Sequence, residues 1–256
     1  MIEFEQIESY YPKKLRVFKK NILREYFQYK ILEIIYNSSC FNKLIFMGGT
    51  ALRIIYDNSR FSEDLDFDNI GITFTEFLKL IDIIKKKLTL EGYNIETDVK
   101  QRGAFIGLVK VKDVLFNYGF SSHSAQKINL EIDAEPQSFR YTPEQKLLNK
   151  FDIFTSIFSM PVDILLSQKI FAILNRSRTM GRDLYDTVFL LGRTKPNVQY
   201  LKEKLGLDDL QKIKEALILK TKELNLEKMA EDIKPFIFDK VDANKVKFFK
   251  DYLSIL

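Results

Sequence analysis

The sequence is poor in the residues that build most metal sites and many catalytic triads. It contains one cysteine, one histidine and no tryptophan in 256 residues. Because Cys40 has no second cysteine to pair with, an intrachain disulfide is excluded, and we expect a cytoplasmic protein in which Cys40 is a small buried side chain. The lone His123 excludes a zinc site made of several histidines. Any chemistry must therefore rest on carboxylates, lysine, arginine and backbone amides.

Flexible linkers and membrane segments are also missing from the pattern. Glycine and proline number only ten and six, and no apolar run approaches the roughly 20 residues that cross a bilayer. The N-terminus is acidic and does not resemble a signal peptide. Forty basic against 35 acidic residues give a formal charge of +5 and a pI of about 9.0. A polyanionic partner is therefore compatible with the charge.

The periodicity of apolar residues predicts a mixed first part and a helical second part. The first part is predicted to contain helices at 13–38, 51–56 and 73–90 and strands at 43–47, 65–67, 93–99, 104–112 and 127–134. Beyond Pro143 the pattern is mostly helical, with helices at 162–176, 182–192, 197–205, 208–222, 226–236 and 242–254. We therefore expect an α+β fold, with a mixed sheet and its helices in residues 1–145 and a helical domain in residues 146–256.

One stretch combines features that point to a bound phosphate and a bound cation. A buried strand ends at Gly48-Gly49-Thr50, and a helix is predicted to begin there with Thr50 as its N-cap. Glycine lets a phosphate approach the backbone, and a helix N-terminus offers N–H groups and partial positive charge. Fourteen residues after Thr50 comes Asp64, followed by Asp66.

Asp64 and Asp66 are spaced to act together. Residues i and i+2 of a strand point to the same face, so the two carboxylates converge while Leu65 points into the core. Each motif alone is common in tight turns and solvated loops. Their combination within 23 residues, ending in Arg60-x-Ser62-x-Asp64-x-Asp66, favours a site for a nucleoside triphosphate bound with Mg²⁺ or Mn²⁺.

This stretch resembles the first motif of the AbiEii/AbiGii toxin family. Members are nucleotidyltransferase-like toxins of type IV toxin–antitoxin systems, related to the DNA polymerase β-type nucleotidyltransferases. Two later segments, Lys169-Ile170-Phe171-Ala172 followed by Asn175-Arg176, and Arg182-Asp183-Leu184-Tyr185-Asp186, are similar to the K-x-x-A…R and R/K-D-x-x-D motifs of the family. The resemblance covers residues 40–195 approximately, in the same order.

The resemblance implies roles for the residues that match. Gly48, Gly49, Thr50, Arg60 and Ser62 would bind the nucleotide, and Asp64 and Asp66 would bind the metal. In the later motifs Lys169 and Arg176 would contact phosphates, while Asp183 or Asp186 would orient Lys169 or the nucleotide. On the residues alone, Lys169 and Arg176 are better explained as solvated cations with apolar stems, and Asp183 and Asp186 as acids that favour a helix N-terminus.

Polymerase β-type chemistry also uses a third carboxylate on a neighbouring strand, which holds metal or takes a proton. The segment from Ile128 to Asp133 alternates strictly, so Asn129, Glu131 and Asp133 share the polar face. We take Glu131 as the third metal ligand and keep Asp133 as the alternative.

The function expected from the resemblance is transfer of a nucleoside monophosphate from an NTP to RNA, with tRNA as the expected acceptor. A separate antitoxin protein would be the partner. The alternative is a nucleotide- or RNA-binding protein without transfer activity. Seven cations between Tyr10 and Lys30 form the first candidate for an RNA surface, and residues 176–193 form the second.

Overall fold

The computed structural model describes residues 2–123 and 125–256, apart from the side chain of Ile255. The chain divides into two compact units. The first unit comprises Met1–Ile55 and Ser62–Ser159, and the second comprises Tyr56–Phe61 and Met160–Leu256. The division after Ser159 lies later than the expected boundary near residue 145, because two unforeseen strands complete the sheet of the first unit.

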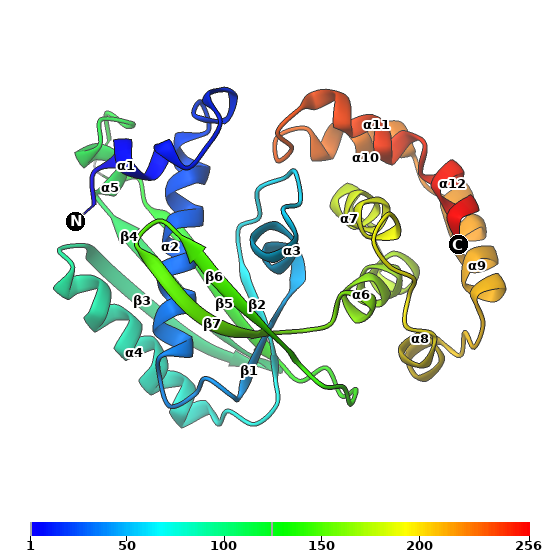
Figure 1. Ribbon diagram of the computed structural model, residues 1–256, viewed down its shortest axis with the longest axis horizontal. Helices are drawn as coiled ribbons and strands as arrows, with labels where there is room; N and C mark the ends of the chain where they lie inside the picture. Colours follow the sequence, from blue (N-terminus) through cyan, green and yellow to red (C-terminus); the bar gives the residue numbers. More distant parts are fainter. Residues whose placement is uncertain (1, 124) are drawn as a thin grey trace. The chain divides into compact units, whose positions relative to one another are not determined.

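A seven-stranded mixed sheet forms the centre of the first unit (Figure 1). Its order is β3-β4-β5-β2-β1-β7-β6. The β2–β5 and β1–β7 pairs are parallel, and the other pairs are antiparallel. The strands are β1 (Leu44–Met47), β2 (Leu65–Asn69), β3 (Asn94–Arg102), β4 (Ala104–Lys112), β5 (Ile128–Glu135), β6 (Glu144–Lys150) and β7 (Ile153–Ser159).

Strands β6 and β7 correct the expectation that the chain becomes helical after Pro143. They form an antiparallel hairpin, and Ile153, Thr155 and Ile157 are buried in alternation with exposed residues. β7 joins the sheet through a single parallel pair, Phe46 with Ser159. This long-range contact with β1 gives the hairpin its place in the sheet.

Helices of the first unit pack on the sheet and connect its strands (Figure 1). Helix α2 begins at Lys19 rather than near residue 13, and helix α3 begins at Gly48, so Thr50 lies within its first turn and is not an N-cap. Thr73 caps α4 in a reciprocal capping box with Glu76. The helices are α1 (Phe4–Ser9), α2 (Lys19–Tyr36), α3 (Gly48–Tyr56), α4 (Phe74–Leu90) and α5 (Val114–Asn117), with a 3-10 turn at Lys13–Leu15.

The two faces of the sheet differ in chemistry at β2 and β5. Gly107 of β4 pairs with Ile132, and a Cβ on Gly107 would lie 2.5 Å from Ile81 Cδ1 of α4. The Ile132 side of the sheet is therefore packed against helix, and side chains one residue along the strand point the other way. Asp66 and Asp133 lie on that second face, as the alternation in the sequence predicts.

The second unit is helical. The expected helix at 242–254 is broken into short turns around Phe248. The segment Tyr56–Phe61 belongs to this unit: Phe61 N–H donates to Phe236 O, and Phe238 N–H donates to Ser59 O. The helices are α6 (Val162–Asn175), α7 (Gly181–Leu191), α8 (Val198–Leu205), α9 (Leu210–Lys222), α10 (Leu226–Ile233), α11 (Asn244–Lys247) and α12 (Phe249–Tyr252), with 3-10 turns at Lys240–Ala243 and Leu253–Ile255.

In the described part of the chain, none of the helices has both the length and the apolar character needed to cross a membrane.

Candidate active site

The glycine motif and the aspartate motif meet at the end of β1. Met47 of β1 pairs with Asp66 of β2, and the backbone turns into α3 at Gly48 with a φ of +77°. A Cβ at this position would lie 2.0 Å from Asp66 Oδ2. Glycine is therefore required here for two reasons: its backbone is left-handed, and the Asp66 carboxylate occupies the space of a side chain. The sequence pattern suggested only a phosphate contact for Gly48.

Asp133 is the carboxylate that strand pairing brings to Asp66. The parallel register of β2 and β5 places Asp66 opposite Asp133 and Leu65 opposite Ile132. Glu131 lies one step further along the same face, beyond the pairs that β2 makes, and faces Leu108 of β4. The register therefore favours the alternative, Asp133, over Glu131 as the third carboxylate.

Electrostatics at Asp133 show how closely the acids gather. Burial, together with the negative charges of Glu131, Asp66 and Asp64, raises the pKa of Asp133 to about 7. Its Oδ1 atom is buried and has no hydrogen-bond partner among the described residues. A carboxylate in this environment is stabilised by a proton or by a cation.

These acids fit a divalent cation in their chemistry. In residues 2–123 and 125–256, no three Asp, Glu, His or Cys side chains form a ready-made metal cage. The carboxylates of Asp64, Asp66 and Asp133 are nevertheless the hard oxygen donors that Mg²⁺ or Mn²⁺ takes, and such ions complete their coordination with phosphate oxygens and water. The Oδ1 atom of Asp133, which makes no hydrogen bond to the described residues, is the oxygen in this group that a cation would stabilise most.

The irregular segment that leads into β2 is held by side chains from two helices. Gln28 of α2, which is buried, donates to Ser62 O at 3.0 Å and to Glu63 O at 2.9 Å. Thr50 of α3 donates its hydroxyl to Asp64 O. Three consecutive carbonyls that no strand partner satisfies are thus fixed by side chains, which sets the direction of the Asp64 backbone.

Arg24 adds a charged contact to the same segment, because its guanidinium pairs with the Glu63 carboxylate. The sequence pattern does not reveal Arg24 or Gln28 as parts of the site. They lie inside an ordinary helical pattern, and only the packing of α2 against residues 62–63 reveals their role. Thr50 is fully buried and its hydroxyl is already engaged, so only its backbone remains for a phosphate.

The later motifs form a compact ion-pair network in the second unit. Lys169 Nζ lies 2.9 Å from Asp186 Oδ2 and 3.7 Å from Asp183 Oδ1. Arg176 Nη1 lies 2.7 Å from Asp183 Oδ2. Arg60 reaches Asp186 with two hydrogen bonds, Nε to Oδ1 at 2.7 Å and Nη2 to Oδ2 at 2.6 Å. Three cations thus surround two buried carboxylates.

Asp186 is strongly stabilised as an anion in this network. Burial alone would raise its pKa, but Arg60 and Lys169 outweigh burial and lower the pKa to about 2. Asp183 and Asp186 both lie within ion-pair distance of Lys169, and the role of Lys169 toward a nucleotide stays a prediction.

Arg60 is placed differently from the expectation that it binds nucleotide. It is 3% exposed, and its third nitrogen donates to Phe61 O, so its guanidinium is occupied within the protein. Ser62 lies in the segment held by Gln28. Arg60 therefore has a structural role, because its hydrogen bonds to Asp186 hold the segment Tyr56–Phe61 against α7 of the second unit.

The predicted RNA surface on the first helices is smaller than its charge count suggests. Lys30 is buried with Glu91 and Asp152, 3.0 and 3.5 Å away, and Arg24 is buried with Glu63. Lys19 lies over the Phe120 ring, 4.5 Å from its centroid. Arg24 and Lys30 therefore serve the fold, whereas Lys13, Lys14, Lys19 and Lys20 are exposed and remain as the reduced first candidate for an RNA surface.

Several solved structures have a similar fold, among them the following three. JHP933 from Helicobacter pylori has a TM-score of 0.58 at 17% identity, covering 91% of each chain. A putative nucleotidyltransferase from H. pylori has a TM-score of 0.59 at 17% identity, covering 91% of this chain and 93% of that one. MenT4, a nucleotidyltransferase toxin from Mycobacterium tuberculosis, has a TM-score of 0.59 at 14% identity, covering 100% and 91%. These likenesses establish a shared fold.

The sequence itself gives the family. Residues 30–253 match the family described as "Nucleotidyl transferase AbiEii toxin, Type IV TA system". No curated protein matches the chain significantly. The protein therefore belongs to the AbiEii nucleotidyltransferase toxin family and is a nucleotidyltransferase, as the motifs predicted. Membership implies an NTP substrate, a divalent metal and a cognate antitoxin.

Proposed function

We propose that the protein transfers a nucleoside monophosphate from an NTP to a hydroxyl group of RNA, with tRNA as the expected acceptor, and that the reaction depends on Mg²⁺ or Mn²⁺. The observation that carries the proposal is the register of β2 with β5, which sets Asp133 beside Asp66 next to the glycine turn. The positive net charge supports a polyanionic acceptor.

Asp64 and Asp66 are the proposed metal ligands, with Asp133 as the third carboxylate and Glu131 as its neighbour. A divalent cation bound there would neutralise the acids and polarise the α-phosphate. Gly49 and the backbone of Thr50 open helix α3 and offer N–H groups to phosphate oxygens.

Asp133 is the proposed base. The acceptor hydroxyl oxygen forms a bond to the α-phosphorus, the bond from that phosphorus to the bridging oxygen breaks, and pyrophosphate leaves. The hydroxyl proton passes to the Asp133 carboxylate, which the strand register places opposite Asp66. Lys169 is the proposed cation for the triphosphate, held in place by Asp183 and Asp186, with Arg176 beside them.

The test is label transfer. The full chain is incubated with each α-labelled NTP, Mg²⁺ or Mn²⁺, and total cellular RNA, and the labelled pool is identified on a gel. We expect label in RNA of tRNA size. Nucleotide binding without label transfer would contradict the proposal and support the alternative of a binding protein.

Two variants assign the third carboxylate. Asp133→Asn is expected to abolish transfer, whereas Glu131→Gln is expected to retain most of it, because only Asp133 pairs with Asp66. The reverse ranking would return the role to Glu131.

A further inference from the structure

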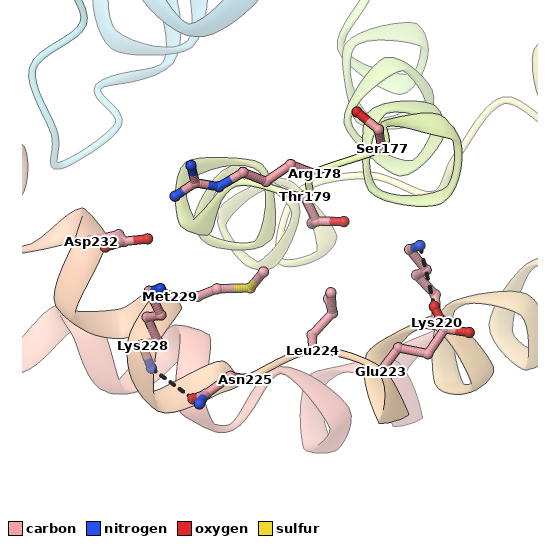
Figure 2. A pocket seen from close by; sticks show the side chains of 10 residues that line it. All are labelled: Ser177, Arg178, Thr179, Lys220, Glu223, Leu224, Asn225, Lys228, Met229 and Asp232. Carbon is pink, nitrogen blue, oxygen red and sulfur yellow. Dashed lines mark hydrogen bonds and ion pairs between the residues drawn. The ribbon is translucent and has the colours of Figure 1, made fainter.

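A pocket in the second unit has no part in the site described above. Its volume is about 390 Å³. The pocket is formed by the segment between α6 and α7, the end of α9 and the start of α10 (Figure 2). This volume lies within the range of about 300–1,000 Å³ that is usual for small-molecule sites. It is lined by Ser177, Arg178, Thr179, Lys220, Glu223, Leu224, Asn225, Lys228, Met229 and Asp232.

The walls of the pocket are fixed by close packing. A Cβ on Gly181 at the start of α7 would lie 2.2 Å from Met229 O of α10, so the two helices meet at a contact that only glycine permits. Thr179 is buried and donates its hydroxyl to Ile173 O at 3.2 Å. Asn225 caps α10 by accepting from Lys228 N–H at 2.9 Å. The pocket is therefore formed before any ligand arrives, which reduces the entropy lost on binding.

The charges in the pocket are only partly compensated. Lys220 lies 3.3 Å from Glu223, and these two side chains neutralise each other. Arg178, Lys228 and Asp232 are exposed to solvent and make no ion pair with any residue in the described ranges 2–123 and 125–256. The pocket thus offers two cations and one carboxylate to a ligand, beside the N-terminus of α10.

This set of groups suits a nucleotide better than a simple anion. A phosphodiester can accept hydrogen bonds from the Arg178 guanidinium and the Lys228 ammonium. The Asp232 carboxylate repels an isolated anion, but it can accept from a ribose hydroxyl or a base amino group. Leu224 and Met229 give the pocket an apolar floor against which a sugar or base can pack.

We propose that this pocket binds one nucleotide unit of the RNA acceptor strand, with its phosphate on Arg178 and Lys228. The inference rests on the proposed function, because it assumes that RNA is the acceptor. The RNA contact then comes from residues 176–193 and the start of α10 rather than from the basic residues around α2.

The experiment compares two charge-matched double variants of the full chain. Arg178→Gln with Lys228→Gln removes both pocket cations. Lys195→Gln with Lys202→Gln removes two exposed lysines of the same unit that do not line this pocket. The affinity for a labelled single-stranded RNA oligonucleotide and for purified tRNA is measured at several salt concentrations.

We expect the pocket variant to bind RNA about tenfold more weakly or worse. Its plot of log affinity against log salt should lose a slope of about 0.7 for each phosphate contact removed. The control variant should keep the wild-type slope. In the transfer assay the pocket variant should show a raised KM for RNA and an unchanged KM for NTP.

Three results would overturn the inference or the proposed function on which it rests. If wild type labels RNA and the pocket variant keeps the wild-type affinity, slope and KM for RNA, the pocket is not the RNA contact and an acidic protein segment becomes the candidate ligand. If wild type transfers no label to any RNA, the proposed function itself fails. A slope that falls equally in both variants would mean diffuse attraction without a pocket.

Discussion

Each unit contains a group of acidic side chains, and the surroundings shift the pKa of the central acid in opposite directions in the two groups. In the first unit Asp133 lies among Asp64, Asp66 and Glu131, and its pKa rises to about 7. In the second unit Asp186 is fully buried, yet Arg60 and Lys169 lower its pKa to about 2. Burial disfavours both anions, so the neighbouring charges decide the sign.

The comparison indicates which group serves stability and which serves the reaction. Compensated charges in the second unit anchor Tyr56–Phe61 and hold α6 against α7. The acids of the first unit repel one another, and folding gains nothing from that repulsion. Such a cost persists in a protein when a ligand relieves it, and here the ligand we propose is a metal-bound NTP.

The largest expected effect is on catalysis in the first unit. Asp64→Asn and Asp66→Asn should each lower the rate of transfer by at least about 100-fold, because metal stabilisation of the transition state is worth several kcal/mol. Both variants should remain folded, since each removes a repelling charge. Soluble variants that both keep more than a few per cent of activity would contradict the assignment.

The next effect is on stability in the second unit. Asp186→Asn leaves Arg60 buried without its anion and should cost about 3–5 kcal/mol in the free energy of unfolding at pH 7. Because the folded pKa of about 2 lies below the unfolded value of 3.8, this stabilisation is present above pH 3.8 and is lost as pH falls through 2.

Urea unfolding of the wild type and of Asp186→Asn, at pH 7 and near pH 2, measures this loss of stability. The matched control is Asp208→Asn, which removes an exposed acid that lies 2.7 Å from Lys212 and should leave the free energy of unfolding close to that of the wild type. Equal losses for the two variants would show that the buried network is not special.

Lys169→Met tests whether this network also serves the nucleotide. The fold should survive because Asp186 keeps Arg60 and Asp183 keeps Arg176. Loss of a cation from the triphosphate should weaken NTP binding by about 1.5–3 kcal/mol, and monophosphate binding by less. Calorimetry measures the affinity of the variant and the wild type for the NTP and for the monophosphate. Equal losses of affinity for the two ligands would mean that Lys169 has only a structural role.

Gln28→Leu tests the support of the acidic group from α2. The variant leaves the carbonyls of Ser62 and Glu63 without the donors that Gln28 supplies, which costs about 1–3 kcal/mol. We therefore expect kcat to fall about tenfold and the concentration of metal needed for activity to rise, with little change in the KM for NTP. The control is Lys30→Met, a buried polar residue of the same helix whose partners are Glu91 and Asp152. A similar fall in kcat in this control would mean that Gln28 only stabilises the fold and does not position the acids.

The smallest effect has a distinctive sign. Asp133→Asn should stabilise the metal-free protein at neutral pH while it abolishes transfer. A folded pKa of about 7 against 3.8 unfolded means that ionisation of Asp133 opposes folding, with no cost below pH 3.8 and the full cost above pH 7. Thermal melts of variant and wild type should therefore coincide near pH 3.5 and separate as pH rises. If Asp133→Asn is less stable than the wild type at pH 7, ionised Asp133 is not repelled by the neighbouring acids and the argument is wrong.

Local patterns in the sequence were sufficient for several features. The alternation in Ile128–Asp133 depends only on strand geometry, so the polar face shared by Asn129, Glu131 and Asp133 could be predicted and is confirmed. Asp64, which was expected on the same strand face as Asp66, lies instead in the irregular segment before β2, which begins at Leu65. The AbiEii family could be identified because its motifs are short and keep their order along the chain.

Only the tertiary structure decided which residues meet. The choice between Glu131 and Asp133 depends on the register of two parallel strands that lie over 60 residues apart in the sequence, and periodicity carries no information about register between distant strands. For the same reason, the sequence could not show that Gln28 holds the segment before Asp64, that Arg60 is an anchor, or that β6 and β7 complete the sheet. Alternation along a strand is a property of neighbouring residues, whereas these contacts arise when distant segments pack together.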